Sequence, residues 1–232
     1  MSAPVKLEAF GDVPGEIQAE LQSIFQVRKF ASGEQIFAQD APASAMYLVA
    51  RGRIKITRVT REGFESVLCV RRPGEYFCPV SVMDRGPQLG TATAMGDVTL
   101  LHADKEQFAS VCKLSPALLS MVQGACIAEV RHLMHRLEAF SFRSVRERLA
   151  LTLLGESRRQ RAKADPPDEI RLTQHDLAGL VGASRESISR ALGRLASDGL
   201  VESGRGWVRI RDREGLKRVA GETGACSARS QP

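Results

Sequence analysis

The stretch from residue 172 to residue 190, LTQHDLAGLVGASRESISR, constrains the possible folds of this 232-residue chain more than any other. Thr173 and Asp176 have the spacing of a capping box, in which each side chain bonds the other residue's backbone N–H at the start of a helix. Gly182-Ala183 interrupts that helix, and Ser184 is a preferred N-cap for a second one. The stretch therefore predicts two helices joined by a short turn, an arrangement typical of helix-turn-helix units that bind DNA.

Each of these two predicted helices has one apolar face. In the first helix, Leu177, Leu180 and Val181 recur at helical spacing. In the second helix, the apolar residues are Ile188, Ala191, Leu192 and Leu195. Four polar residues lie off this stripe, on the N-terminal half of the second helix: Arg185, Glu186, Ser189 and Arg190. These four are the candidate base-reading residues, because that half of a recognition helix meets base edges in the major groove.

The distribution of charge favours a nucleic-acid partner. The net charge is +6, and residues 143–220 carry 17 Lys and Arg against 11 Asp and Glu, whereas residues 1–142 carry 15 of each kind. The positive excess therefore surrounds the predicted helix-turn-helix, where it can meet phosphates. A solvated basic face is the alternative interpretation. The candidate phosphate contacts, which position a protein without reading sequence, are Gln174, Ser184 and Arg205.

The N-terminal half of the chain has the pattern of a β-domain. Between residues 27 and 108, short alternating runs are separated by glycine and proline, which is typical of a β-sandwich or β-roll. The expected strands cover 35–38, 46–49, 53–57, 66–70 and 98–101, and a short amphipathic helix over 16–25 precedes them. The expected turn points are Gly33, Gly52 and Pro73-Gly74.

Residues 116–142 change to a helical period. Apolar side chains recur in heptad-like steps at Leu119, Cys126, Val130, Leu133, Leu137 and Phe140. Such a seam is long enough to pair with a second copy of the helix. The alternative is a helix packed on its own β-roll. We favour a homodimer, because a two-fold protein would match a two-fold DNA site.

The remaining segments complete a winged unit. Residues 145–156 predict a helix that buries Leu149, Leu153 and Leu154, and residues 157–169 read as a charged loop with a double proline. Val201 and residues 207–210 can pair as a β-hairpin around 203–206. The expected fold is α+β, with a β-roll sensor over 1–113, a dimerisation helix over 114–143, a winged helix-turn-helix over 144–221 and a disordered tail over 222–232.

Composition and motifs exclude several classes of protein. Five unevenly spaced cysteines favour a reducing cytoplasm over a disulfide framework. No apolar run reaches the ~18 residues that span a bilayer, so we expect no membrane association. Nucleophile elbows, Walker loops and metal-spaced histidine pairs do not occur in the sequence. We therefore do not expect an enzyme.

The order of these parts resembles the CRP/FNR family of bacterial transcription factors. The segments that carry the resemblance are 43–55 (ASAMYLVARGRIK), 72–77 (RPGEYF) and 172–201. The resemblance implies a β-roll like a cyclic-nucleotide-binding domain, a long dimerisation helix and a winged helix-turn-helix. It also implies a regulator of transcription, more often an activator, that contacts RNA polymerase.

We call the predicted helix-turn-helix over residues 172–190 the reader. Within the reader, the family's base-contacting pair corresponds to Glu186 and Arg190. Arg185, directly before the glutamate, makes the motif similar to that of the cyclic-AMP-responsive branch. Ser189, directly before the arginine, makes it similar to that of the oxygen- and nitric-oxide-responsive branch. Arginine can bind guanine O6 and N7 with two hydrogen bonds, and glutamate can accept from cytosine N4. We therefore expect a palindrome with TTGAT-like or TGTGA-like half-sites. The alternative role for Glu186 is a partner of the helix dipole.

The resemblance does not extend to the family's cyclic-nucleotide cassette. Cys78-Pro79 stands where Gly-Glu would bind the ribose, and Gln88-Leu89-Gly90 stands where arginine would bind the cyclic phosphate. Leu133 and Met134 stand where polar groups would bond the purine. A buried phosphate without a guanidinium partner is costly, so we do not expect cyclic AMP as the ligand.

Several signals remain open. Residues 1–68 contain no cysteine, so the N-terminal iron–sulfur cluster of the oxygen-sensing branch is not expected. Cys78 could present a thiolate to haem iron, in an apolar pocket formed with Phe77, Leu133 and Met134. Thiol oxidation at Cys78 or Cys126, another small ligand, and constitutive DNA binding without a ligand are the alternatives. A buried structural cysteine is the commonest fate of a single thiol.

Overall fold

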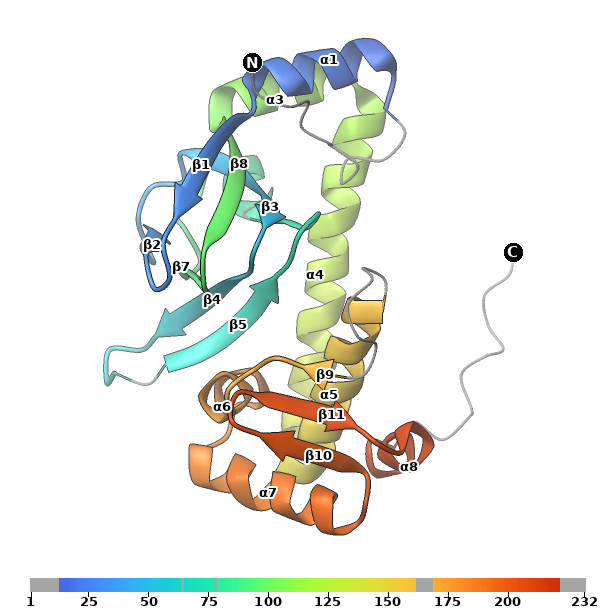
Figure 1. Cartoon of the computed structure of the whole chain (residues 1–232). Helices are drawn as coiled ribbons and strands as arrows, with labels where there is room; N and C mark the ends of the chain where they lie inside the picture. The colour runs from blue at the N-terminus through green and yellow to red at the C-terminus, as the bar shows by residue number, and fades with distance from the viewer. Residues whose placement is uncertain (1–12, 64, 78, 162–168, 222–232) are drawn as a thin grey trace, which may run out of the picture. The chain divides into compact units, whose positions relative to one another are not determined.

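The computed structural model describes residues 13–63, 65–77, 79–161 and 169–221 (Figure 1). Contacts divide the chain into two compact units, residues 1–133 and 134–232. This boundary falls inside the long helix rather than at either of its predicted ends. The four-part division expected from the sequence stays a prediction, and its tail over 222–232 lies outside the described residues.

The first unit is the β-roll with its flanking helices. Two four-stranded sheets, ordered β1-β8-β3-β6 and β2-β7-β4-β5, are built from antiparallel pairs. The strands are β1 (Gln26–Phe30), β2 (Gln35–Phe37), β3 (Ala45–Arg51), β4 (Ile54–Val59), β5 (Glu65–Arg71), β6 (Tyr76–Phe77), β7 (Thr91–Ala94) and β8 (Val98–Asp104). The helices are α1 (Gly15–Ile24), α2 (Pro79–Met83) and α3 (Lys105–Leu114), followed by α4 (Pro116–Phe142). All five expected strands and the expected β-roll are confirmed.

Two apolar clusters hold this unit together. One lies between the sheets, where Phe77 stacks on Tyr47 with ring centroids 5.1 Å apart and Phe37 lies against both. The other joins the roll to its helices, where Phe25 meets Phe108 edge to face at 6.3 Å. All three expected turn points have a positive φ, at Gly33, Gly52 and Gly74.

The long helix α4 changes its environment along its length. Leu118 and Val122 are fully buried in the roll, and Leu119 packs half-buried beside them. Arg71 on β5 forms a 2.8 Å ion pair with Glu129, which ties the helix to the sheet. The apolar residues that follow are exposed instead: Ile127, Val130, Leu133, Met134, Leu137 and Phe140. The predicted seam is therefore divided, because its first residue, Leu119, belongs to the core of its own roll.

The second unit is the winged helix-turn-helix. Its helices are α5 (Val145–Arg161), α6 (Gln174–Val181), α7 (Arg185–Ser197) and α8 (Arg213–Val219). Its three-stranded sheet is ordered β10-β11-β9, from β9 (Glu169–Ile170), β10 (Val201–Gly204) and β11 (Trp207–Ile210). The predicted hairpin is confirmed, with Gly204 opposite Trp207.

The predicted charged loop over 157–169 was wrong at both ends. Helix α5 continues through Ser157 to Arg161, because Ser157 is fully buried and accepts a hydrogen bond from Arg213. At the other end, Glu169 begins strand β9 and forms a 2.6 Å ion pair with Arg209 on β11. Residues 162–168, which include the double proline, lie outside the described residues.

Among the described helices, none alone combines the length and apolar composition of a membrane span. Only α3 and α4 taken together, at a bend of 120°, meet those criteria.

Candidate nucleic-acid interface

The first helix of the reader, α6, begins with the predicted capping box. Thr173 Oγ1 accepts from the backbone N–H of Asp176 at 3.1 Å, and Asp176 Oδ2 accepts from the backbone N–H of Thr173 at 3.1 Å. Asp176 is buried, so its carboxylate is held in place and two otherwise unpaired donors are satisfied. The start of α6 is therefore fixed by local sequence.

The turn between α6 and α7 requires glycine at position 182. Gly182 has φ of 65°, and a Cβ atom there would lie 2.3 Å from Cε1 of Phe140. Arg148 on α5 donates to the carbonyl oxygens of Val181 at 3.1 Å and Gly182 at 3.2 Å, and its guanidinium lies 5.0 Å from the Phe140 ring centroid. The end of α4, the start of α5 and the turn of the reader thus meet at one joint.

The recognition helix α7 has the predicted division of faces. Ser184 accepts from the backbone N–H of Ser187 at 3.2 Å and caps the helix. The predicted apolar stripe is buried in full: Ile188, Ala191, Leu192 and Leu195. The four candidate base-reading residues are all exposed: Arg185, Glu186, Ser189 and Arg190. They share the solvent face of the N-terminal half of α7.

The Glu186 carboxylate is electrostatically suited to accept hydrogen bonds. A hydrogen bond from its own backbone N–H, followed by one from Ser184, lowers the pKa of Glu186 below its usual value. Glu186 is thus ionised at neutral pH and can act only as an acceptor. On the same face, Arg190 makes a 3.3 Å contact from Nη2 to Ser187 Oγ.

The three candidate phosphate contacts come from different ends of elements. Gln174 is the first residue of α6 and is half-buried, and Ser184 caps α7. Arg205 is exposed in the turn between β10 and β11, next to Gly206 with φ of 86°. Each is thus located at a turn or helix start, where a backbone phosphate can approach.

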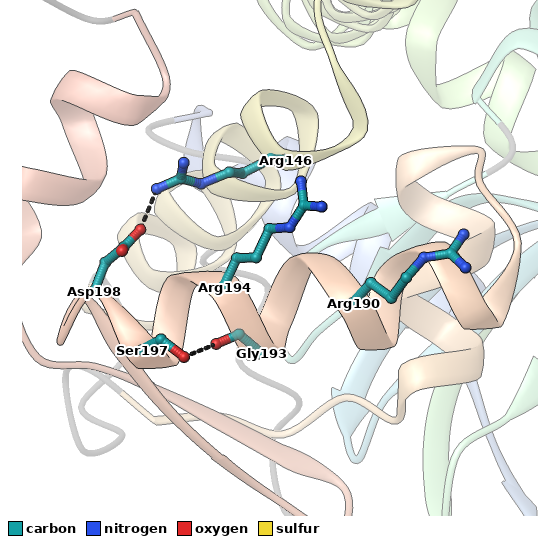
Figure 2. A pocket seen from close by; sticks show the side chains of 6 residues that line it. All are labelled: Arg146, Arg190, Gly193, Arg194, Ser197 and Asp198. Atoms are coloured by element: carbon teal, nitrogen blue, oxygen red, sulfur yellow. Dashed lines mark hydrogen bonds and ion pairs between the residues drawn. The ribbon is translucent and has the colours of Figure 1, made fainter.

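A groove between α5 and α7 continues from the base-reading face. It has a volume of about 440 Å³ and is lined by Arg146, Arg190, Gly193, Arg194, Ser197 and Asp198 (Figure 2). Sequence reasoning assigned a role to Arg190 but not to Arg146 or Arg194. The spacing of four residues from Arg190 could have indicated Arg194, whereas Arg146 comes from another helix and carries no local signal.

The predicted effector residues lie in different environments. Phe77 is fully buried within the roll, whereas Leu133 and Met134 are exposed. Cys78 lies outside the described residues. The apolar pocket expected from these four side chains therefore stays a prediction.

The cassette positions in the roll hold no guanidinium. Gln88 is buried, and its backbone pairs with Ala41 and Asp40 across the sheet edge. Leu89 is 53% exposed, and a Cβ atom on Gly90 would lie 2.6 Å from the carbonyl oxygen of Thr57. The nearest guanidinium contact in this segment is that of Arg58, which donates to the backbone carbonyl of Leu89 at 2.7 Å.

Two cysteines in the described part of the chain are poor thiolates. Burial raises the pKa of Cys112 to about 11, and burial followed by the Asp84 charge raises the pKa of Cys126. His132 and His135 are exposed. Within the described residues, no group of three or more His, Cys, Asp or Glu side chains could hold a metal ion.

Comparisons with known proteins agree with this architecture. A model of the cyclic nucleotide-binding domain matches residues 27–115, and a model of the Crp-like helix-turn-helix domain matches residues 147–219. The cyclic AMP receptor protein of Thermus thermophilus is 33% identical over 210 residues, covering 90% of this chain and 94% of that protein. The CRP-like cAMP-activated global transcriptional regulator of Mycobacterium tuberculosis is 28% identical over 194 residues, covering 83% and 84%.

Solved structures give the same result. The structure of FixK2 from Bradyrhizobium japonicum superposes with a TM-score of 0.76 at 20% identity, covering 84% of this chain and 97% of that one. The catabolite activator protein of Thermus thermophilus superposes with a TM-score of 0.53 at 31% identity, covering 92% and 98%. These matches confirm the resemblance found in the sequence, and the chain belongs to the CRP/FNR family of transcription regulators.

Proposed function

We propose that this protein is a homodimeric regulator of transcription that binds a palindromic site with TTGAT-like or TGTGA-like half-sites. One observation carries the proposal: Arg185, Glu186, Ser189 and Arg190 share the exposed face of α7, while the opposite face is buried. A guanidinium and a carboxylate one helical turn apart can form hydrogen bonds with bases in neighbouring base pairs, the guanidinium with guanine and the carboxylate with cytosine. Activation through RNA polymerase is part of the proposal by family resemblance.

The exposed side chains of α4 support the homodimer. Ile127, Val130 and Leu133 are exposed in the first unit, and Met134 and Leu137 are exposed in the second. Apolar residues that recur every three or four positions form a stripe along one side of a helix, and such a stripe typically packs against a second helix. A contiguous exposed apolar stripe of this kind marks an interaction surface.

The joint at Gly182 supports transmission of a signal from the dimerisation helix to the reader. Phe140 is in the last turn of α4, and its ring occupies the space beside Gly182 that a Cβ would need. Arg136 from the same helix donates to the carbonyl oxygen of Leu180 at 3.3 Å. A rotation of the end of α4 would therefore act directly on the turn that orients α7.

Selection from a pool of random double-stranded DNA tests the proposed function. We expect enrichment of a palindrome whose half-sites contain a GA step paired with TC and whose centres are about one helical turn apart. Sequencing of the bound pool after successive rounds is the measurement. An unenriched pool, or an asymmetric site, would contradict the proposal of a two-fold, sequence-specific reader.

We propose further that the signal is not cyclic AMP, although two of the relatives named above are called a cyclic AMP receptor protein and a cAMP-activated regulator. The absence of a guanidinium at Gln88, Leu89 and Gly90 supports this, since a buried phosphate needs a charged partner. Titration calorimetry with cyclic AMP should give no binding heat, with the Thermus thermophilus cyclic AMP receptor protein as the positive control. Saturable binding by this protein would refute the proposal.

The alternatives for the signal are haem at Cys78, thiol oxidation at Cys78 or Cys126, another small ligand, and no ligand. Two of the residues proposed to line a haem pocket argue against it, because Phe77 is packed in the roll and Leu133 is exposed. The raised pKa of Cys126 also argues against rapid oxidation of that thiol. An absorption spectrum with added haem, compared between the wild type and Cys78→Ser, separates the haem proposal from the others.

A further inference from the structure

The groove between α5 and α7 contains more positive charge than base reading requires. Arg190, Arg194 and Ser197 are spaced by four and three residues, so they follow one face of α7 beyond its base-reading half. Arg146, from the first turn of α5, lines the same groove from the opposite side. Three guanidiniums and one carboxylate, Asp198, thus surround a volume of about 440 Å³.

The guanidiniums in the groove have different partners. Arg146 Nη2 forms an ion pair with Asp198 Oδ2, which holds Arg146 over the C-terminal end of α7. The Arg194 side chain makes no hydrogen bond or ion pair within the described part of the chain. Figure 2 shows the Arg194 side chain directed toward α5, whereas Arg190 extends toward the N-terminal end of α7. Arg146 and Arg194 therefore form a pair that is separate from the base-reading Arg190.

The floor of the groove is open. A Cβ atom on Gly193 would meet no heavy atom within 4 Å, so the backbone of α7 is accessible there. The Ser197 hydroxyl donates to the carbonyl oxygen of Gly193 at 2.9 Å and so turns toward the helix. A planar guanidinium on each side of an uncovered helix backbone can bind an anion with two hydrogen bonds from each fork.

We propose that Arg146 and Arg194 form a binding site for a phosphate of the DNA backbone, next to the bases that α7 reads. The inference rests on the proposed function and adds two contacts to it. When the N-terminal half of α7 lies in the major groove, its C-terminal half leads toward the sugar–phosphate wall. The groove is continuous with the base-reading face through Arg190, and this continuity favours DNA over an acidic protein surface.

Asp198 is a positioning residue in this proposal. Its ion pair with Arg146 keeps the guanidinium at the groove in the free protein, while one carboxylate against three guanidiniums leaves the site positive. A phosphate can then bind Arg194 directly and share Arg146 with Asp198.

The dependence of DNA affinity on salt concentration tests the proposal. Each phosphate contact adds about 0.9 to the negative slope of log K against log salt concentration for B-DNA. The double variant Arg146→Ala/Arg194→Ala should make the slope shallower by about one for every copy bound, and Arg194→Ala and Arg146→Ala should each make it shallower by less than that. The double variant should weaken specific and random DNA by a similar factor, on the order of tenfold. Fluorescence anisotropy over a series of salt concentrations, on both DNAs, is the measurement.

Two further variants make the test independent of the arginines' own packing. Gly193→Asp introduces a carboxylate into the open floor, where there is space for it, and should weaken both DNAs. Arg218→Ala is the matched control, because Arg218 is an exposed arginine of the same unit on α8 and does not line the groove. Its slope should equal that of the wild type.

The outcomes separate this inference from the proposed function. If the wild type binds no DNA, the proposed function fails. If the wild type binds its palindrome but Arg194→Ala, Arg146→Ala and Gly193→Asp keep the wild-type slope, the function stands and the phosphate site is refuted. An unchanged slope with lost transcription activation would assign the groove to an acidic protein partner instead and would also overturn the inference.

Discussion

Leu137→Glu is expected to convert the protein from a dimer to a monomer and to abolish tight binding to its palindrome. Leu137 is 67% exposed on α4, within the apolar stripe proposed to pair with a second copy. In such an interface, a carboxylate from each copy would lose its hydration without gaining a partner. The cost of several kcal/mol would weaken the dimer by about a thousandfold, since about 4 kcal/mol corresponds to that factor.

Sedimentation velocity and DNA-binding assays measure the two effects of Leu137→Glu. The matched control is Leu114→Glu, because Leu114 is 68% exposed at the end of α3, outside the stripe. We expect Leu114→Glu to remain a dimer with wild-type DNA affinity. If Leu137→Glu stays a dimer, or if both variants dissociate equally, α4 does not form the interface.

Arg190→Ala is expected to reduce the discrimination between the palindrome and random DNA by about 1–3 kcal/mol for each half-site. A bidentate contact between arginine and guanine contributes about 1–3 kcal/mol of discrimination per base pair. Arg190 is exposed, and the one hydrogen bond of its side chain within the described residues is the 3.3 Å contact with Ser187, so removing the side chain should leave the helix intact. The loss should therefore fall on specific binding.

Anisotropy titrations with the selected palindrome and with a random duplex, at one salt concentration, measure this discrimination. Circular dichroism verifies that Arg190→Ala is folded, and Arg218→Ala again serves as the control arginine. Equal losses on both DNAs would show that Arg190 contacts phosphate rather than bases. That result would remove the base-reading role without changing the assignment of Arg146 and Arg194.

Local signals explain why the reader could be predicted closely. The capping box at Thr173 and Asp176, the N-cap at Ser184 and the stripe from Ile188 to Leu195 each depend on residues three or four positions apart. Such contacts form within one turn of helix, so their geometry is fixed by sequence spacing alone. The exposed position of Arg185, Glu186, Ser189 and Arg190 follows from the buried position of that stripe.

Patterns that have more than one possible partner could not be assigned in the same way. An apolar seam on a helix has the same sequence pattern whether it packs on a β-roll or on another helix. In α4 the two ends of the seam differ, because Leu119 packs in the roll and Val130 is exposed. The segment after Glu156 looked like a charged loop because its arginines are hydrophilic. It continues as helix, since Ser157 is buried against the second unit's core and bonded by Arg213, 56 residues away.

By itself, the sequence determined which structural elements the chain forms: a β-roll, a long helix and a capped helix-turn-helix whose exposed residues can contact DNA bases. The tertiary structure alone decided which distant side chains meet. Arg146 and Asp198 are separated by 52 residues, and Phe140 reaches Gly182 from another helix. The physical reason is that capping and periodicity act over a few residues, whereas a groove or a joint depends on how whole helices pack.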